Sequence, residues 1–253
     1  MKNSVTVFVD RLGEEPYASV LCYPRVDANE LMKRLEELRV LGVRAVEFSG
    51  EASVSNVPVV GKGYVGVVVI AYLDKERVAL KIRRIDADRV GLNYEAEMLQ
   101  KANSVNIGPK FVNASKNFLL MQFIDGDLLP RWLVKVKEKQ VVRNVLAEIL
   151  EQCYRLDSIG LDHGEISKAP KHLIVDKSKK PWIVDFETSS INRKPANVTA
   201  VCQYLFSSNG AVARVVADIL GERSIDNLID VLRIYKKFRT RENFERVLQT
   251  CLY

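Results

Sequence analysis

The sequence predicts an α+β protein in which a β-rich half is followed by a mostly helical half. Residues 59–83 contain two β-branched apolar runs around a glycine cluster, and residues 86–102 have helical spacing. Beyond Asp127 the pattern is mostly helical, apart from two short strand patterns at "HLIV" and "WIVDF". With 253 residues, 47% hydrophobic and 28% charged, the chain can bury the core of one larger domain or of two lobes.

The first 55 residues predict an additional ββαβ segment. "VTVFV" alternates as a strand does, and "YASVLCY" is expected to form a second strand after a turn. Asp27 and Glu30 have the spacing of a helix capping box, and Gly42 suits the end of that helix. "VRAVEF" then predicts another strand. The segment carries no chemical motif, so we expect a structural extension.

The glycine cluster "VVGKGYVGVVV" contains Gly61, Gly63 and Gly66 in a GxGxxG arrangement. In a dinucleotide-binding fold these glycines would open a helix. Here they precede a β-branched apolar run, which favours a strand–turn–strand hairpin whose amides can approach phosphate oxygens. An ordinary glycine-rich hairpin is the alternative interpretation.

The strand pattern "RVALKI" places Lys81 inside an apolar run. A lysine there costs free energy unless an anion or a carboxylate meets it. In the helix expected over residues 86–102, Glu95 lies on the apolar stripe and Glu97 faces away. We therefore expect Glu95 to pair with Lys81 and Glu97 to be solvated.

Over residues 59–190 the chain resembles the protein-kinase-like superfamily. Three features carry the resemblance by their order: the glycine loop, then "VALK", then a helix glutamate followed by "ML". The resemblance implies a bilobal fold, with an extension at 1–55, an N-lobe and hinge at 56–126, and a short helical C-lobe at 127–253. It also implies that Lys81, oriented by Glu95, holds the α- and β-phosphates of ATP. The stretch "LLMQFIDG" would be the hinge beside adenine, with the implied contacts Met121, Gln122, Phe123 and Ile124.

Two further motifs match the catalytic end of that superfamily. "HGE" at residues 163–165 implies that Glu165 is the catalytic base and that His163 is structural. "DFE" at residues 185–187 implies that Asp185 is the ligand of Mg²⁺. Glu165 stands where an aspartate is usual, so its carboxylate reaches about 1.5 Å further. That difference affects the rate unless the loop backbone compensates.

Other positions depart from the superfamily pattern. His172 stands where an asparagine is expected, and imidazole is a better ligand for Mn²⁺ than for Mg²⁺. A metal-binding role and a capping role for His172 are both open. Lys168 and Lys171 could neutralise the γ-phosphate or could be solvated loop lysines. Glu187 replaces a glycine, and a role as an extra metal ligand is the less favoured interpretation.

Only about a dozen residues separate Asp185 from the helix expected near Asn197, which leaves no room for a long activation segment. This feature and the compact tail look most like the atypical RIO-type kinases and their small archaeal relatives. The resemblance implies transfer of phosphate from ATP to serine or threonine of a protein, or of the chain itself, in ribosome assembly or tRNA modification. A nucleotide-gated binding module with slow turnover and a small-molecule kinase are the alternatives.

Composition limits the remaining classes of function. Four scattered cysteines and two histidines make a zinc site improbable and predict reduced, packed thiols. The net charge of +6 includes basic clusters at residues 81–84, at 135–143 and in "YKKFRTR". These clusters suit a solvated face, or contact with RNA or a ribonucleoprotein. No signal region is apparent, and the longest apolar run, residues 65–73, is too short to span a bilayer, so we expect a cytoplasmic protein without a membrane partner.

Overall fold

A computed structural model describes residues 4–166, 170–207 and 210–253. The chain forms two compact units. The first comprises Met1–Glu97 and Lys110–Phe123, and the second comprises Met98–Pro109 and Ile124–Tyr253. The first unit is built on a β-sheet and the second is mostly helical, so the predicted α+β fold class is confirmed.

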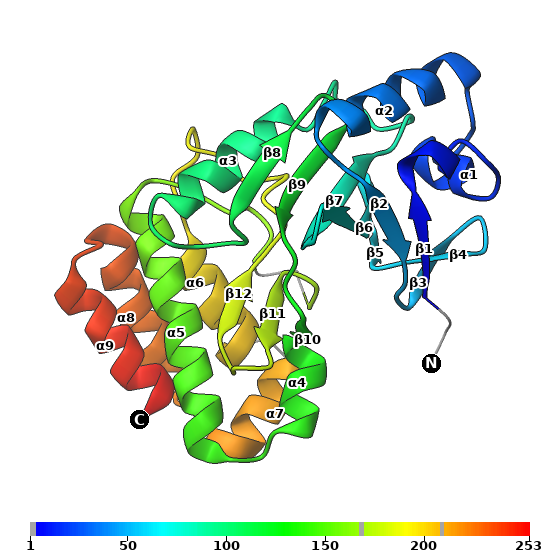
Figure 1. The fold of residues 1–253 in the computed structure, drawn as a ribbon. Helices are drawn as coiled ribbons and strands as arrows, with labels where there is room; N and C mark the ends of the chain where they lie inside the picture. The colour runs from blue at the N-terminus through cyan, green and yellow to red at the C-terminus, as the bar shows by residue number, and fades with distance from the viewer. Residues whose placement is uncertain (1–3, 167–169, 208–209) are drawn as a thin grey trace. The chain divides into compact units, whose positions relative to one another are not determined.

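The first unit contains a seven-stranded antiparallel sheet with the order β1-β2-β6-β7-β9-β8, in which β5 also pairs with β6 (Figure 1). The amino-terminal segment therefore contributes two strands to the same sheet as the glycine hairpin. A separate two-stranded hairpin joins β3 to β4. The strands are β1 (Val5–Phe8), β2 (Ala45–Phe48), β3 (Ala52–Val54), β4 (Val57–Val59), β5 (Gly61–Lys62), β6 (Gly66–Leu73), β7 (Glu76–Arg83), β8 (Phe111–Ala114) and β9 (Phe118–Gln122).

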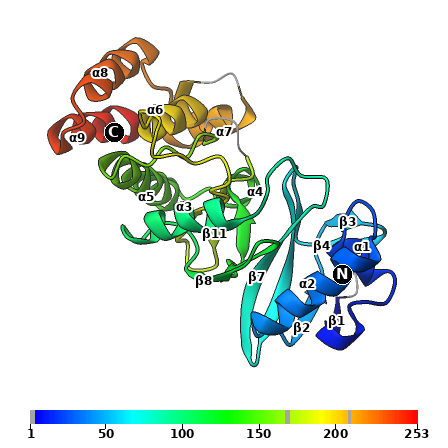
Figure 2. The ribbon, with the colours of Figure 1, turned by 90° about the horizontal axis from the view of Figure 1, so that it is seen from above.

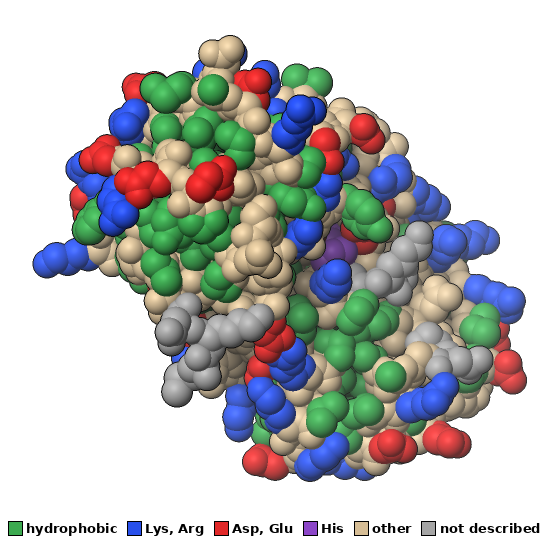
Figure 3. All heavy atoms as spheres, turned by 90° about the vertical axis from the view of Figure 1, so that its right-hand side faces the viewer, with side chains coloured by type: hydrophobic (Ala, Val, Ile, Leu, Met, Phe, Trp, Pro, Cys, Tyr) green, Lys and Arg blue, Asp and Glu red, His purple; other side chains and the backbone are tan. Residues whose placement is uncertain are grey.

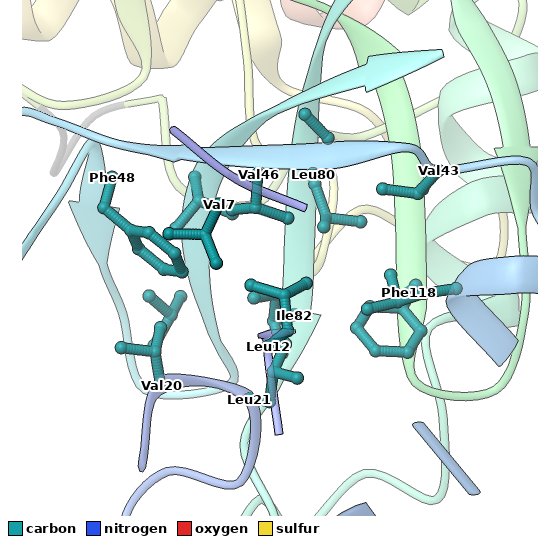
Figure 4. Packing of buried hydrophobic residues seen from close by; sticks show 14 of the residues in the cluster. Val7, Leu12, Val20, Leu21, Val43, Val46, Phe48, Leu80, Ile82 and Phe118 are labelled. Carbon is teal, nitrogen blue, oxygen red and sulfur yellow. The ribbon is translucent and has the colours of Figure 1, made fainter. Parts of the chain in front are cut away.

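Helices α1 (Tyr17–Leu21) and α2 (Ala28–Val40) lie along one side of this sheet, after a short 3-10 turn at Val9–Arg11 (Figures 1 and 2). Apolar side chains from these helices meet those of the sheet in one buried cluster (Figure 4). Burial of such side chains is the main stabilising contribution to folding. The labelled members of the cluster are Val7, Leu12, Val20, Leu21, Val43, Val46, Phe48, Leu80, Ile82 and Phe118.

The second strand predicted for the amino-terminal segment, "YASVLCY", is wrong, because its first five residues form α1. Ala18, Leu21 and Cys22 are all buried, and their spacing of three and four residues is that of a helix face. The segment is too short for its apparent alternation to distinguish a strand from one helical turn and a half.

The predicted ends of helix α2 are confirmed, and the next predicted helix is present with a different start. Asp27 caps α2 by accepting a hydrogen bond from the Glu30 amide at 2.8 Å, and Gly42, with φ +78°, follows the helix end. Helix α3 (Asn93–Asn103) is present but begins seven residues later than predicted. The amide of Leu92 donates to the carbonyl of Lys116, which holds the preceding segment against the β8–β9 turn instead of in a helix.

The second unit combines helices with a small three-stranded sheet of order β10-β11-β12. Its longest helix, α5, packs against α6, α7, α9 and β12. The helices are α4 (Leu129–Lys135), α5 (Lys139–Ser158), α6 (Asn197–Cys202), α7 (Ala211–Leu220), α8 (Ile225–Lys237) and α9 (Arg241–Leu252), with a π-helical turn at Gln203–Ser207. The strands are β10 (Gly126–Leu128), β11 (Leu173–Asp176) and β12 (Pro181–Ile183).

The cysteines of the chain, Cys22, Cys153, Cys202 and Cys251, are buried free thiols, as the sequence predicts. Among the helices that the structure describes, none combines the length and the apolar character needed to cross a membrane. The boundary predicted at residues 55 and 56 stays a prediction.

Candidate active site

Lys81 and Glu95 form a buried ion pair in the first unit. The Lys81 ammonium nitrogen lies 2.9 Å and 2.8 Å from the two carboxylate oxygens of Glu95. Strand β7 supplies the lysine and the first turn of α3 supplies the glutamate, while Glu97 is exposed on the same helix. Both partners are at most 5% exposed, so water does not screen the pair. The pairing expected from the helix stripe is present, and it fixes the position of the ammonium group.

The glycine loop is the turn of the predicted hairpin. Gly61 of β5 pairs with Val68 of β6, and the Gly63 amide donates to the Gly66 carbonyl at 2.8 Å. A Cβ atom at Gly66 would lie 2.9 Å from a backbone oxygen of β7 and 3.1 Å from Cγ of Lys81. Gly66 is therefore required so that the lysine side chain can pass across β6. Gly61 and Gly63 have no neighbour closer than 3.8 Å and 3.5 Å to a Cβ at their positions.

The four residues expected beside adenine follow one another at the end of β9 and beyond it. Met121 and Gln122 are the last residues of β9, Phe123 is the last residue of the first unit, and Ile124 begins the longer segment of the second unit. All four are half-buried. The Arg77 guanidinium lies 4.5 Å from the Phe123 ring centre, which steadies the end of the strand. Their contact with adenine stays a prediction.

In the second unit, the HGE loop is held on both sides. The His163 amide donates to the side-chain oxygen of Asn197 at 2.9 Å, and the Thr188 hydroxyl donates to the His163 carbonyl at 3.1 Å. Gly164 has φ +88°, and a Cβ atom there would lie 2.9 Å from the Thr188 carbonyl and 2.6 Å from the Arg193 guanidinium. Only glycine fits this position without strain, so Gly164 fixes the backbone conformation immediately before Glu165.

Asn197 holds the HGE loop through hydrogen bonds that sequence reasoning missed. Its side-chain amide donates to Asp157 at 2.9 Å and to the Leu161 carbonyl at 2.7 Å. Asp157 also accepts a hydrogen bond from the Tyr235 hydroxyl at 2.9 Å. Burial raises the pKa of Asp157, and burial together with the Asp157 carboxylate raises the pKa of Tyr235. The network joins α5, α6 and α8, and its only sequence signal is an asparagine at the start of α6.

His163 has the structural role expected of it. Its ring is fully buried, and Nε2 donates to the Val184 carbonyl at 3.1 Å, because a carbonyl oxygen only accepts. Burial, and to a smaller extent the nearby His172 ring, lower the pKa of His163 to about 4. The ring is therefore neutral near pH 7.

Asp185 lies in a backbone conformation that most residues avoid. Its φ is +69°, in the left-handed region that aspartate tolerates better than most other residues. The next residue, Phe186, is buried with its ring edge-on to His163 at 5.2 Å between ring centres. A Cβ atom at Gly108 would lie 2.8 Å from the Phe186 ring, so glycine leaves room for it. The buried phenylalanine thus holds Asp185 in place.

Glu165, His172 and Asp185 converge in the second unit. Nε2 of His172 lies 3.5 Å from a carboxylate oxygen of Asp185 and 3.8 Å from one of Glu165. The pairing of β11 with β12 explains this, because the Val184 amide donates to the His172 carbonyl at 3.0 Å. A carboxylate oxygen of Glu187 lies within 4.8 Å of one of Asp185.

The donor set fits a divalent cation. Carboxylate oxygens suit both Mg²⁺ and Mn²⁺, and the imidazole nitrogen of His172 would favour Mn²⁺. Among the described residues of this unit, Asp185 and Glu187 have carboxylate oxygens close enough to share an ion, and His172 lies beside Asp185 as a further candidate ligand. Lys171, the residue before His172, is exposed, and Lys168 lies outside the described residues.

The basic cluster at residues 81–84 is not the surface patch that the sequence allowed. Lys81 and Arg83 are buried, and Arg83 donates to the side chain of Asn117 at 2.9 Å. The lysines at residues 135–139 and at 236–237 are exposed. On the face drawn in Figure 3, Lys and Arg side chains recur over much of the surface with Asp and Glu side chains among them.

Comparisons with known proteins agree with this geometry. A model of the RIO domain matches residues 71–200, just over half of the chain, and the match includes Lys81, Glu95, Glu165 and Asp185. An uncharacterized protein of Methanocaldococcus jannaschii is 29% identical over 119 residues, which are 47% of this chain and 98% of that protein. The glycine loop precedes the matched range of the domain model. Its hairpin geometry is therefore an observation that is independent of the match. The chain belongs to the RIO domain family, an atypical family of kinase-like proteins.

Proposed function

We propose that the protein is an ATP-dependent phosphotransferase that transfers the γ-phosphate to a serine or threonine hydroxyl of a protein, or of the chain itself. The buried Lys81–Glu95 pair beside the glycine hairpin carries the proposal. A buried ammonium whose position is fixed by a carboxylate can bind an anion without a large loss of side-chain entropy. The α- and β-phosphates would bind to Lys81 and to amides of the Gly61–Gly66 loop, with Met121 to Ile124 beside adenine.

Asp185 is the proposed principal metal ligand, with His172 as the second and Glu187 as a further candidate. A bound Mg²⁺ or Mn²⁺ would neutralise charge on the phosphates. The left-handed backbone of Asp185 and the buried Phe186 support this role, because they hold the carboxylate where His172 also points.

Glu165 is the proposed acceptor of the hydroxyl proton. It is half-exposed, so an acceptor hydroxyl can reach it. As the hydroxyl oxygen bonds to the γ-phosphorus, the bond to the bridging oxygen of ADP breaks and the proton passes to Glu165. Lys171 and Lys168 are proposed to neutralise charge on the transferred group.

A nucleotide-gated binding module is the second candidate. The observation that favours it is the position of His172, 3.8 Å from the Glu165 carboxylate. A histidine that interacts with the base competes for it with the acceptor hydroxyl, which would slow turnover. ATP would then control association with RNA or a ribonucleoprotein, for which the exposed lysines at residues 135–139 and 236–237 are suited.

Single-turnover transfer from γ-labelled ATP, measured in Mg²⁺ and in Mn²⁺, tests both candidates. Label is followed into protein and into free phosphate for the wild type and for the variants Lys81→Ala, Glu165→Ala and Asp185→Ala. Glu97→Ala is the matched control, because Glu97 is the exposed neighbour of Glu95 on α3.

A protein kinase labels protein only in the wild type and in Glu97→Ala, and Lys81→Ala and Asp185→Ala also weaken ATP–metal binding. ATP binding without transfer in either metal favours the binding module. Normal ATP affinity in both Lys81→Ala and Asp185→Ala contradicts the assigned site.

A further inference from the structure

Tyr23, in the amino-terminal segment, contacts the glycine loop. Its half-buried ring is contacted by two cations: the Lys62 ammonium nitrogen is 4.4 Å from the ring centre, and the Arg84 guanidinium carbon is 4.9 Å from it. Lys62 lies inside the glycine loop, and Arg84 follows the strand that carries Lys81. Cations above an aromatic face are attracted by its quadrupole, so the ring joins the loop to the end of β7.

Arg84 also binds the loop directly. Its guanidinium donates to the Gly63 carbonyl at 3.1 Å, and its amide donates to the Val65 carbonyl at 2.8 Å. Two hydrogen bonds to Asp86, at 2.9 Å and 2.7 Å, fix the orientation of the guanidinium. The loop backbone is thus held on each side of Tyr64, the exposed residue at its tip.

The contact has a buried support. The Ile85 amide donates to the Tyr23 carbonyl at 2.9 Å. Arg34 of α2, fully buried, donates to the carbonyls of Leu21 and Arg83, which lie just before Tyr23 and Arg84 in the chain. One buried guanidinium therefore connects both sides of the contact. Removing it would leave two buried carbonyls without that donor.

We propose that Tyr23 and Arg84 are positioning residues for the phosphate-binding loop, so that the amino-terminal segment is a working part of the nucleotide site. The inference rests on the proposed nucleotide-binding function and extends it to Tyr23, which lies outside the matched RIO domain. A loop that is restrained before the nucleotide arrives loses less entropy on binding. The restraint therefore acts on ATP affinity and leaves the chemical step unchanged.

Hydrogen exchange of the loop in the nucleotide-free protein tests the restraint without any ligand. Amides of residues 61–66 are expected to exchange about threefold to tenfold faster in Tyr23→Ala and in Arg84→Met than in the wild type. Tyr23→Phe keeps the ring and restores the slow exchange. Arg44→Met is the matched control, because Arg44 is an exposed arginine of the same unit that pairs with Asp74. Lys62→Met removes one cation without touching the core, in case Tyr23→Ala fails to fold.

Steady-state kinetics then separate positioning from general structure. Tyr23→Ala is expected to raise KM for ATP about threefold to tenfold, with kcat within about twofold of the wild type, and Tyr23→Phe is expected to keep the wild-type KM. Unchanged exchange in Tyr23→Ala and Lys62→Met, or faster exchange with unchanged KM, overturns the inference. If the loop exchanges faster in the variants but the wild type binds no nucleotide, the restraint itself is supported. The nucleotide role is then overturned, both in this inference and in the proposed function.

Discussion

At the scale of one residue, substitution of Gly164 tests how tightly the HGE loop is packed. Gly164→Ala is expected to destabilise the protein by about 2–3 kcal/mol, because the residue has φ +88° and a Cβ atom would lie 2.9 Å from the Thr188 carbonyl. Gly160→Ala is a matched control with φ +74° and no atom within 4 Å of its Cβ, so it adds only the backbone strain, about 1 kcal/mol. Urea unfolding of both variants gives the two values. Equal losses of stability would show that the close contacts are relieved without cost.

His163 makes stability depend on pH. Burial holds its folded pKa at about 4, below the unfolded value of 6.5, so the unfolded state binds the proton first as pH falls. This contribution is complete above the unfolded pKa and is lost as pH drops toward the folded one. The wild type is expected to lose about 2 kcal/mol between about pH 7 and about pH 4.5 from this group, measured by urea unfolding in a chelator. His163→Gln should lack this part of the slope, and an unchanged slope would contradict the assignment.

At this scale, the sequence predicts contacts that depend on short-range spacing. Glu95 could be chosen over Glu97 because a helix turns by a constant angle per residue, and the ion pair with Lys81 is present. Asn197 could not be chosen, because its partners, Asp157 and Leu161, lie 40 and 36 residues away. Hydrogen bonds between distant residues leave no periodic pattern.

The network around Asn197 links whole elements, so its prediction belongs to helices α5, α6 and α8. Asn197→Ala removes one of several donors to Asp157, the side-chain donor to the Leu161 carbonyl and the acceptor for the His163 amide. Leaving buried polar groups unpaired is expected to lower the free energy of unfolding by about 2–4 kcal/mol. The rate of phosphate transfer should also fall, because the HGE loop that carries Glu165 loses this support. Thermal unfolding and single-turnover transfer are the measurements.

Asn144→Ala is the control for this change, because Asn144 is an exposed asparagine on α5 and should lose less than about 0.5 kcal/mol. If Asn197→Ala were as mild as this control, the network would not hold the HGE loop. A loss of stability without any effect on transfer would limit Asn197 to a purely structural role.

The two wrong element predictions have a common physical cause. Helix α1 and the start of α3 are decided by contacts with other parts of the first unit, not by local pattern. α1 buries Val20 and Leu21 against the sheet, and Leu92 is bound to the β8–β9 turn. The helix α2, in contrast, has both its cap and its stop within its own sequence, and was predicted to within one residue. Sequence patterns therefore predict the bounds of an element correctly where contacts within that element determine them.

At the scale of the molecule, the role of the amino-terminal segment depends on pairing over long distances. Strand β2 pairs with β6 in an antiparallel register in which Val46 lies opposite Ala71. Such pairing cannot be deduced from either strand alone, because each presents an ordinary apolar pattern. The sequence therefore predicted the strand at residues 43–48 but not the sheet that it joins.

Phe48 offers the sharpest measure of how far the first unit depends on this segment. The side chain is fully buried and its ring stacks on Tyr17 with centres 4.9 Å apart. Phe48→Ala is expected to cost about 3–5 kcal/mol of the free energy of unfolding, while Val40→Ala, at a site that is 78% exposed on α2, should cost less than about 0.5 kcal/mol. Urea unfolding followed by hydrogen exchange of β6 and β7 measures both the loss and its location. A small loss confined to residues 1–55 would mean that the segment folds beside the sheet without supporting it. A large loss that also releases β6 and β7 would mean that the strand carrying Lys81 depends on the amino-terminal segment for its stability.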